Sequence, residues 1–227
     1  MPKNTKAIKI SDLIANKPWL KKINDYKYSE NTINTRKRFL IICEGQTEEM
    51  YFKSFPVLAD IKTISKGSTK SKLVETVKHY TEDEEYDEIW CVFDMDYNPK
   101  ITNQQEDFNS AIKKAIILEY KCAYSNDAFE LWFVLHYKYL DQKELRTEYF
   151  KILSKYWNIN YEKDGKSKKF SRIVYNKLVN DPKSEQKEAI RNAKKLHESQ
   201  MNQSYHDQNP VTTVYLLVDE LNLHLRK

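Results

Sequence analysis

Two short apolar runs in this chain end directly in acidic residues. Residues 39–43 run into Glu44, and residues 89–93 run into Asp94. A short apolar run that ends in charge is typical of a strand buried on both faces, as in a parallel sheet. The carboxyl ends of neighbouring parallel strands meet at one edge of the sheet, where ligands bind. The two runs therefore predict an α/β fold in which acidic side chains from separate strands converge.

The rest of the pattern alternates between strands and helices. We expect strands at residues 37–43, 61–65, 89–93 and 122–124, and helices at residues 47–55, 70–80 and 107–120. This spacing predicts βαβ units, with a mostly parallel central sheet flanked by helices.

The C-terminal half has a helical pattern. A buried helix is expected at residues 128–139, followed by a helical elaboration at about 140–205. Asn209-Pro210 is typical of a helix start, with Asn as the N-cap and Pro at the first helical position. The predicted domains are a basic N-terminal arm at residues 1–34 and one main domain at residues 35–227.

Charge is distributed unevenly along the 227 residues, whose net charge is +5. Residues 1–40 carry ten Lys/Arg and three Asp/Glu, whereas residues 41–100 carry seven and thirteen. Basic residues around an acidic site suit a polyanionic substrate such as nucleic acid, although solvated surface lysines are the alternative explanation. The candidate phosphate contacts are Lys66, Lys70, Lys166, Lys168 and Lys169.

Several function classes lack their signatures. No apolar stretch approaches the roughly 18 residues of a membrane span, and the lysine-rich start lacks the apolar run of a signal peptide, so we expect a cytoplasmic protein. No Gly-rich Lys-Ser/Thr motif for ATP is visible, so any ATP dependence would come from a partner. The three cysteines, widely spaced, are expected to be small buried hydrophobes.

The acidic residues after the two strands form the candidate site. Glu44 and Glu48 are four apart, and Asp94 and Asp96 are two apart, which within a strand places both on one face. Four carboxylates in one crevice repel one another unless cations neutralise them, and Mg²⁺ or Mn²⁺ suits such oxygen ligands. The alternatives are a helix-capping role for Glu44 and an ordinary turn for the two aspartates. Glu130, in an aromatic helix, must be paired if buried, by metal or by lysine.

Four ordered motifs together resemble a known family. They are Cys43-Glu44-Gly45-Gln46-Thr47-Glu48 with Tyr51-Phe52, Phe93-Asp94-Met95-Asp96, residues 125–132 with Leu135-His136, and Asn209-Pro210 with Thr213-Val214. From about Lys37 to the C-terminus the chain looks like the RloB/AbiLii family, which is similar to Toprim domains and OLD-related nucleases. The resemblance implies a Toprim-like sheet and a Mg²⁺-dependent nuclease in bacterial anti-phage defence, usually alongside an ATPase of the RloA/AbiLi type.

The resemblance also implies roles for individual residues. Glu44 matches the Toprim glutamate, Glu48 the second acid of the nuclease branch, and Asp94 and Asp96 the metal-binding pair. Glu130 falls where a further acid would join the site. The chain departs from the expected pattern at Asp127-Ala128, where a smaller turn residue and Pro or Cys would be expected.

Three functions remain open on the sequence. The first is Mg²⁺-dependent phosphodiester hydrolysis of DNA or RNA, with Glu44 and Glu48 in catalytic roles and the five acids as metal ligands. The second is a non-catalytic nucleic-acid-binding or regulatory subunit that acts with a partner ATPase. The third is transfer chemistry of the topoisomerase or primase kind, for which the chain is short. The oligomeric state, a homo-oligomer included, stays open.

Overall fold

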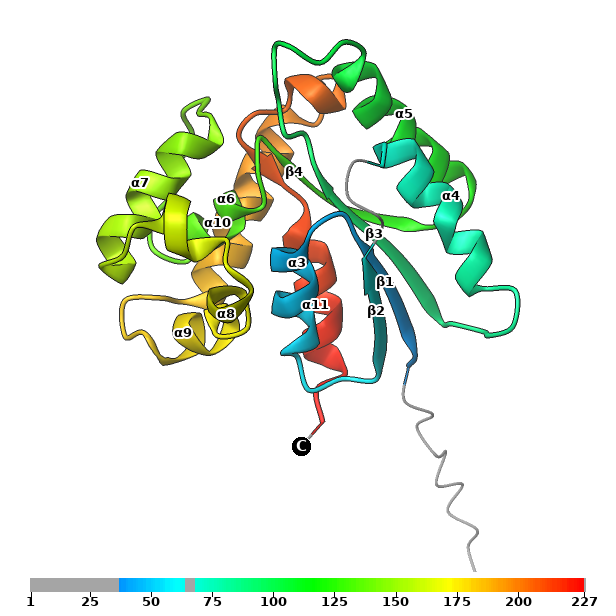
Figure 1. Ribbon diagram of the computed structural model, residues 1–227, viewed down its shortest axis with the longest axis horizontal. Coiled ribbons are helices and arrows are strands. Elements are labelled where there is room, and N and C mark those ends of the chain that lie inside the picture. Colours follow the sequence, from blue (N-terminus) through cyan, green and yellow to red (C-terminus); the bar gives the residue numbers. More distant parts are fainter. Residues whose placement is uncertain (1–36, 64–67, 227) are drawn as a thin grey trace, which may run out of the picture. The chain divides into compact units, whose positions relative to one another are not determined.

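A five-stranded sheet lies at the centre of the computed structural model, which describes residues 37–63 and 68–226 (Figure 1). Its order in the described residues is β2-β1-β3-β4-β5. The strands are β1 (Phe39–Cys43), β2 (Ala59–Thr63), β3 (Glu88–Asp94), β4 (Lys121–Asn126) and β5 (Val211–Thr212). The first four are mutually parallel and β5 is antiparallel to β4, which confirms the predicted α/β fold with a mostly parallel sheet.

The chain reverses its direction of winding between β1 and β3. From β1 it passes to β2 on one side, and it then returns to β3 on the other side. In the register of the pair, Cys43 lies opposite Val92, and the N–H of Glu44 donates to the carbonyl of Val92 at 2.9 Å. Ligands bind at such a switch point in open α/β sheets. The two acids that follow the apolar runs therefore emerge at the same place.

Helices cover both faces of the sheet. The helices that flank it are α3 (Gln46–Lys53), α4 (Lys70–Tyr80), α5 (Gln104–Ile117) and α11 (Val214–Leu223). On one face α3 and α11 cover the sheet, and on the other face α4 and α5 cover it (Figure 1). Phe39 and Ile41 belong to the first core, whereas Leu40 and Ile42 belong to the second. Because both faces are packed, every residue of β1 is apolar and buried.

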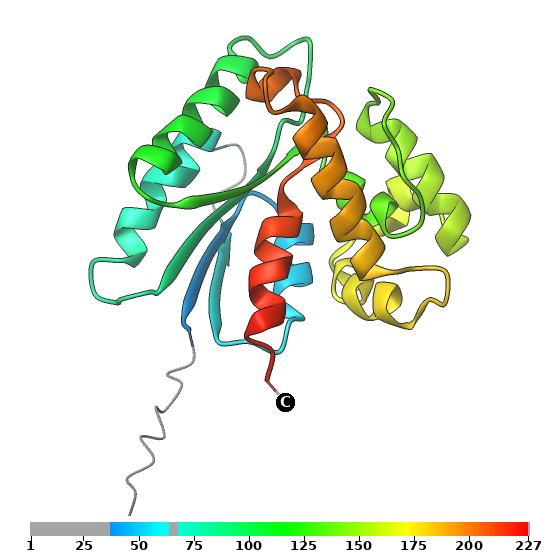
Figure 2. The ribbon, with the colours of Figure 1, turned by 180° about the vertical axis from the view of Figure 1, so that it is seen from behind.

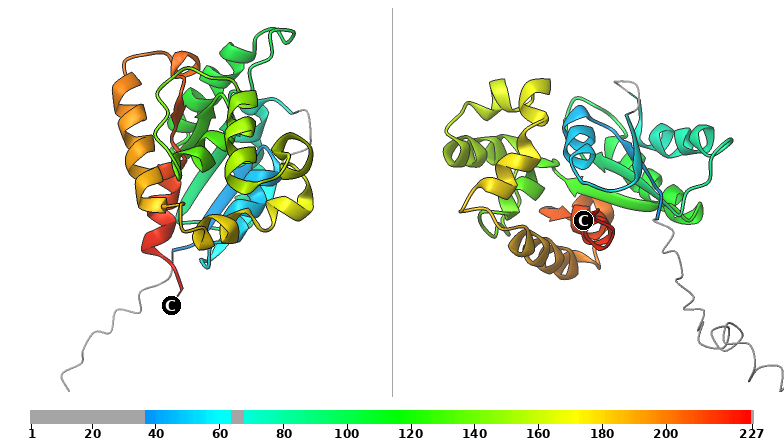
Figure 3. Two further views of the ribbon diagram at one scale, coloured as in Figure 1. Left: turned by 90° about the vertical axis from the view of Figure 1, so that its left-hand side faces the viewer. Right: turned by 90° about the horizontal axis from the view of Figure 1, so that it is seen from below.

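The remaining helices form a group beside the sheet (Figure 3). They are α6 (Glu130–Leu135), α7 (Arg146–Trp157), the π-helical turn η2 (Tyr161–Gly165), α8 (Lys168–Ser171), α9 (Val174–Asn180) and α10 (Gln186–Gln200). The 3₁₀ turn η3 (Tyr205–Asp207) instead contacts α5. Helix α6 is completely buried and contacts both α7 and α10, while α10 also contacts α11, as seen from behind in Figure 2. Helices α7 to α10 are the helical elaboration that the sequence predicts at about 140–205, and α6 is the buried helix that it predicts before them.

One predicted element is wrong. Asn209-Pro210 does not start a helix, because Val211 and Thr212 follow it as β5, and α11 begins only at Val214. Val211 and Thr212 pair with β4, and the N–H of Thr213 donates to the carbonyl of Tyr124 at 2.8 Å. Pairing with a distant strand outweighs the local capping preference.

Other predictions differ in their bounds or fall outside the described residues. Helix α6 is shorter than the expected 128–139, since it begins at Glu130 and ends at Leu135. The basic arm at residues 1–34 and the end of the second predicted strand at 64–65 lie outside the described residues. In the part that is described, no helix has both the length and the apolar character needed to cross a membrane.

Candidate functional site

A cavity of about 330 Å³ lies at the carboxyl edge of β1 and β3. The ionisable residues that line it are Glu44, Glu48, Asp94, Asp96, Glu130, Arg146 and Lys166. All five acids singled out in the sequence therefore meet around one space. They come from the loop after β1, the first turn of α3, the end of β3, the loop after it, and the start of α6.

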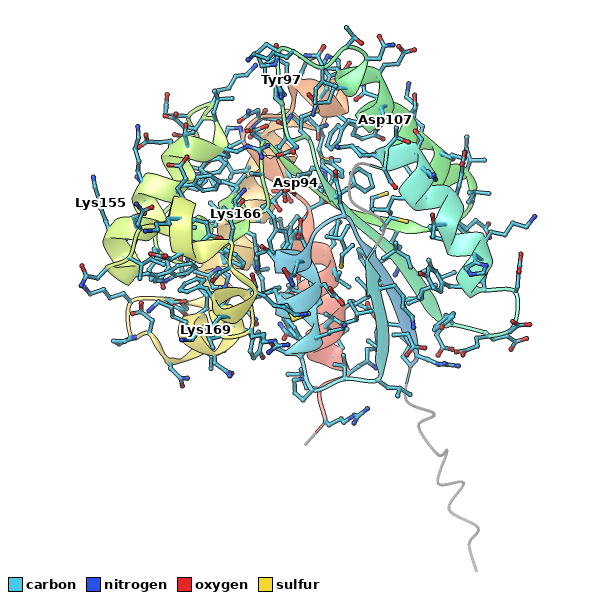
Figure 4. All side chains as sticks on the ribbon, in the orientation of Figure 1. Asp94, Tyr97, Asp107, Lys155, Lys166 and Lys169 are labelled. Atoms are coloured by element: carbon cyan, nitrogen blue, oxygen red, sulfur yellow. The ribbon has the colours of Figure 1, made fainter. Side chains whose placement is uncertain are left out.

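Glu44 connects the two strands and a buried lysine. Its Oε2 accepts the backbone N–H of Asp94 at 3.3 Å, and its Oε1 lies 3.2 Å from the Lys70 Nζ. Lys70 is buried at the first residue of α4, and Asp107 of α5 accepts its backbone N–H at 2.8 Å (Figure 4). Lys70 was expected to contact phosphate, but in the structure it is ion-paired with Glu44 inside the protein.

Glu48 is buried in the first turn of α3, with 6% of its surface exposed. Burial, followed by the neighbouring charges of Glu130 and Glu44, raises its pKa to about 8. Gly45 makes this position available, because a Cβ at Gly45 would overlap the Oε2 of Glu48. The glycine is therefore explained by close approach of the Glu48 carboxylate.

Asp94 and Asp96 have different environments. The Oδ1 of Asp94 is buried and lacks a hydrogen-bond partner in residues 37–63 and 68–226. Burial and then the charges of Glu48, Glu130 and Glu44 raise the pKa of Asp94 well above its usual value. An unpartnered buried carboxylate oxygen is costly, which makes the Oδ1 of Asp94 a candidate ligand atom for a cation.

Asp96 is not on the face of a strand. Because β3 ends at Asp94, the expectation that the two aspartates share a strand face is wrong. Asp96 has a φ of 54°, in the left-handed region that Asp tolerates better than most residues. Its N–H donates to the carbonyl of Asp127 at 2.9 Å, and its carboxylate forms an ion pair with Arg146. The turn brings the carboxylate back to the rim of the cavity.

Glu130 belongs to the buried wall of the site. It is 4% exposed, and burial raises its pKa. The hydroxyl of Tyr161 donates to its Oε1 at 3.2 Å, and the charge of Lys166 opposes the pKa shift. Glu130 is thus hydrogen-bonded by a tyrosine, and the charge of Lys166 is close enough to act on it, but within residues 37–63 and 68–226 no lysine forms an ion pair with it.

We expect a Gly165→Ala substitution to destabilise this wall. A Cβ at Gly165 would overlap the ring of Tyr161, which is fully buried and cannot move aside freely. Overpacking of this kind costs about 1–3 kcal/mol in the free energy of unfolding. Chemical denaturation of the variant measures this cost, and a second substitution, Tyr161→Leu, should recover part of it. An unchanged midpoint in Gly165→Ala would contradict the packing at Tyr161.

Two site residues were missed in the sequence. The Nε of Arg146, at the start of α7, lies 3.6 Å from the Oδ2 of Asp127, while its Nη2 forms the ion pair with Asp96. Asp127 is 1% exposed and accepts the N–H groups of Tyr97 at 2.7 Å and Arg146 at 3.1 Å. Asp127 falls in the motif at residues 125–132, but no local pattern assigns a role in the site to either residue, because their partners come from other elements. The Asp127-Ala128 departure was the one available signal.

The four predicted lysines other than Lys70 separate into three groups. Lys166 lines the cavity, and its Nζ lies 4.6 Å from the centre of the Phe150 ring. Lys168 and Lys169 are exposed on α8 and do not line the cavity; Figure 4 shows Lys169 away from Asp94. Lys66 lies outside the described residues.

The donor set suits a hard divalent cation that shares its coordination with a substrate. Among the described residues, no three His, Cys, Asp or Glu side chains converge closely enough to form a ready metal cage. Mg²⁺ is usually held by only one or two carboxylates, with waters and substrate phosphates completing the octahedron. The unpartnered Oδ1 of Asp94, with Glu48 and Glu130 beside it, fits that kind of open site.

Comparison with protein families gives one finding. The family model described as "RloB: RloB-like protein" matches residues 39–221, which include the whole sheet and all five acids. Neither the curated proteins nor the solved structures contain a match. The match to the family model extends over most of the chain. This chain belongs to the RloB-like family.

Proposed function

We propose that the protein is a Mg²⁺- or Mn²⁺-dependent nuclease that hydrolyses phosphodiester bonds of DNA or RNA. The observation that carries this proposal is the cavity at the switch point, where five acids face Arg146 and Lys166. Acids alone suit a cation, and guanidinium and ammonium groups suit phosphate. Having both around a cavity of about 330 Å³ supports a substrate that brings a phosphate to a metal.

The chain's own residues divide the work in this proposal. Asp94, Glu48 and Glu130 would hold the cation, which when bound lowers the pKa of water and neutralises the scissile phosphate. Glu44, oriented by Lys70 and the N–H of Asp94, would take a proton from the attacking water.

On the facing wall, cations from the helical elaboration would bind the non-bridging phosphate oxygens. Arg146 offers a planar fork of donors, and Lys166 offers a single charge on a flexible stem. Arg146 must leave Asp96 to do so, which frees the Asp96 carboxylate at the same moment.

Gly45→Ala is expected to reduce cleavage without unfolding the protein. The added Cβ would push the Glu48 carboxylate out of its position, but Gly45 has an extended φ of −122° that alanine also adopts. Displacing a ligand indirectly typically costs 10–100-fold in metal affinity or activity, and we expect a loss of about that size. Steady-state cleavage and thermal unfolding of the same preparation measure the two effects. Full activity in Gly45→Ala would contradict the assigned position of Glu48.

The basic test of the proposal is cleavage of labelled DNA and RNA by the purified protein with Mg²⁺ or Mn²⁺. We expect products in the presence of the cation and none in excess EDTA. Wild-type cleavage that survives EDTA would overturn the metal-dependent proposal.

The second candidate function is a non-catalytic nucleic-acid-binding subunit. It is favoured by two ion pairs, Glu44 with Lys70 and Asp96 with Arg146, which neutralise two of the acids without a metal ion. Nucleic-acid binding that persists in EDTA, with no cleavage even in a complex with a partner, would support this candidate over the nuclease.

We further propose that the protein acts in the bacterial cytoplasm in anti-phage defence, together with an ATPase of the RloA/AbiLi type. Family membership supports this context, and so does the lack of a P-loop motif in the sequence. Co-expression with the neighbouring ATPase of such a system, followed by co-purification, tests the partnership. Failure of the two chains to associate, with or without ATP, would count against it.

A further inference from the structure

We infer that the substrate is single-stranded and that Tyr97 forms a subsite for the unpaired base next to the cleaved phosphate. This inference rests on the proposed nuclease function and adds a substrate class to it. It starts from a second cavity of about 330 Å³ that lies along the loop after β3. The residues that line that cavity are Tyr97, Pro99, Ile101, Asn103, Gln104, Gln105 and Glu106.

The chemistry of the second cavity suits a nucleobase. Tyr97 is 45% exposed and Ile101 is 56% exposed, so a ring and an aliphatic side chain are both available at its surface. Beside them lie the side-chain amides of Asn103 and Gln105 and the acid Glu106, and the amide of Asn103 forms no capping bond with α5. Aromatic rings stack on any base, and Asn and Gln amides hydrogen-bond base edges. Apolar stacking surface and amides together are not what a phosphate requires.

The two cavities are separated by a short, well-held loop. Tyr97 is three residues from Asp94, so the two backbones are at most about 10 Å apart, which is up to three stacked nucleotides. The N–H of Tyr97 is held by the carboxylate of Asp127, and Gln104 donates to the carbonyl of Met95 at 3.2 Å and accepts the N–H of Asn98 at 2.8 Å. Tyr97 therefore has a defined position relative to the acids (Figure 4).

The burial of the acids independently disfavours a duplex. Glu48 and Glu130 are 6% and 4% exposed, and the Oδ1 of Asp94 is buried. The scissile phosphate must enter the cavity between the sheet edge and Arg146 and Lys166 to reach them. A flexible single strand, whose bases are unstacked and accessible, can do so and present a base to Tyr97. Paired bases in a duplex are not available for stacking on a protein ring.

The test measures binding and cleavage by the full-length protein on matched 12-mers. The probes are single-stranded DNA, RNA of the same sequence, the blunt DNA duplex, and a single strand in which three adjacent bases are replaced by abasic sites. Binding is measured with Ca²⁺ in place of Mg²⁺ at one salt concentration, because phosphate contacts depend strongly on salt. The DNA and RNA arms distinguish the two sources of a single strand.

We expect single strands to bind at least 10-fold more tightly than the duplex. Tyr97→Ala should weaken single-strand binding about 10-fold, in line with base–aromatic stacking, while Tyr97→Phe should retain it. The abasic strand should bind weakly and be insensitive to Tyr97→Ala, since the two changes remove the same contact. Tyr156→Ala, at a tyrosine 37% exposed on α7, is the matched control and should leave binding unchanged.

Each outcome decides between the two proposals. Equal cleavage rates for duplex and single strand, unchanged by Tyr97→Ala, would overturn the base subsite but agree with the proposed nuclease function. Tyr97-dependent binding of single strands without any cleavage in Mg²⁺ or Mn²⁺ would support the subsite and count against the nuclease. The subsite is overturned if Tyr97→Ala weakens binding of the abasic strand as much as binding of the intact strand, or if no probe binds.

Discussion

Asp94→Asn is expected to reduce divalent-dependent cleavage by about 10³-fold, which corresponds to roughly 4 kcal/mol of transition-state stabilisation. Asparagine has the same shape as aspartate but lacks the charge that a cation needs. The Oδ1 of Asp94 is a buried oxygen of the cavity that has no hydrogen-bond partner in the described residues, so the substitution removes the negative charge from the acid most available to a cation. Single-turnover cleavage at saturating Mg²⁺ measures the effect.

The same substitution should leave the fold intact or make it more stable. Burial and the nearby acids raise the pKa of Asp94, so the charged form of this side chain destabilises the metal-free protein. Asp83→Asn, at an exposed acid in the linker before β3, is the matched control and should retain full activity. Glu44→Gln should also abolish cleavage. If Asp94→Asn cleaves at the wild-type rate, the assignment of Asp94 as a metal ligand is wrong.

Glu48→Gln is expected to stabilise the metal-free protein at pH 8 by about 2–4 kcal/mol. The pKa of Glu48 is about 8 in the folded protein, against 4.5 as the ordinary value, so the folded state binds more protons than the unfolded state between these values. The contribution of Glu48 to stability is therefore fully present below pH 4.5 and is lost as pH rises through 8. Glutamine stays neutral, so the variant avoids this loss.

Urea unfolding at several pH values between 5 and 8.5, in EDTA, measures the difference. The gain of Glu48→Gln over wild type should grow with pH. Glu49→Gln is the matched control on the same turn of α3; Glu49 is ion-paired with Lys53, so its substitution should give no gain that grows with pH. Mg²⁺ should raise the free energy of unfolding of the wild-type protein at pH 8 and have little effect on that of Glu48→Gln. A pH-independent difference between wild type and Glu48→Gln would contradict the buried, acid-crowded environment of Glu48.

Strands that are buried on both faces of the sheet can be predicted from the local sequence, because such burial requires a run of apolar residues. The apolar runs 39–43 and 89–93 were recognisable because a central parallel strand has no solvent face and so carries few polar residues. Each run is followed directly by an acid, which is why Glu44 and Asp94 could be chosen without a structure. Asn209-Pro210 shows the limit, since a good local helix start was overridden by pairing of β5 with β4.

The cations of the site depended on contacts between distant segments. Lys70 and Lys166 were expected to act alike, yet Lys70 is buried against Glu44 because Asp107 of α5 holds the start of α4 there. Arg146 reaches Asp96 only because the buried Asp127 receives the backbone of α7. No periodicity or residue spacing in the sequence indicates these contacts.

Local sequence patterns were enough to predict that acids at the ends of β1 and β3 meet in one site. This is possible because strand burial constrains only a few consecutive residues and therefore produces a recognisable local pattern. The tertiary structure alone decided which acid stays unpaired, which cations face it, and where Tyr97 stands beside the site. Those outcomes depend on contacts between segments far apart in the chain, whose geometry is set by packing of the whole fold.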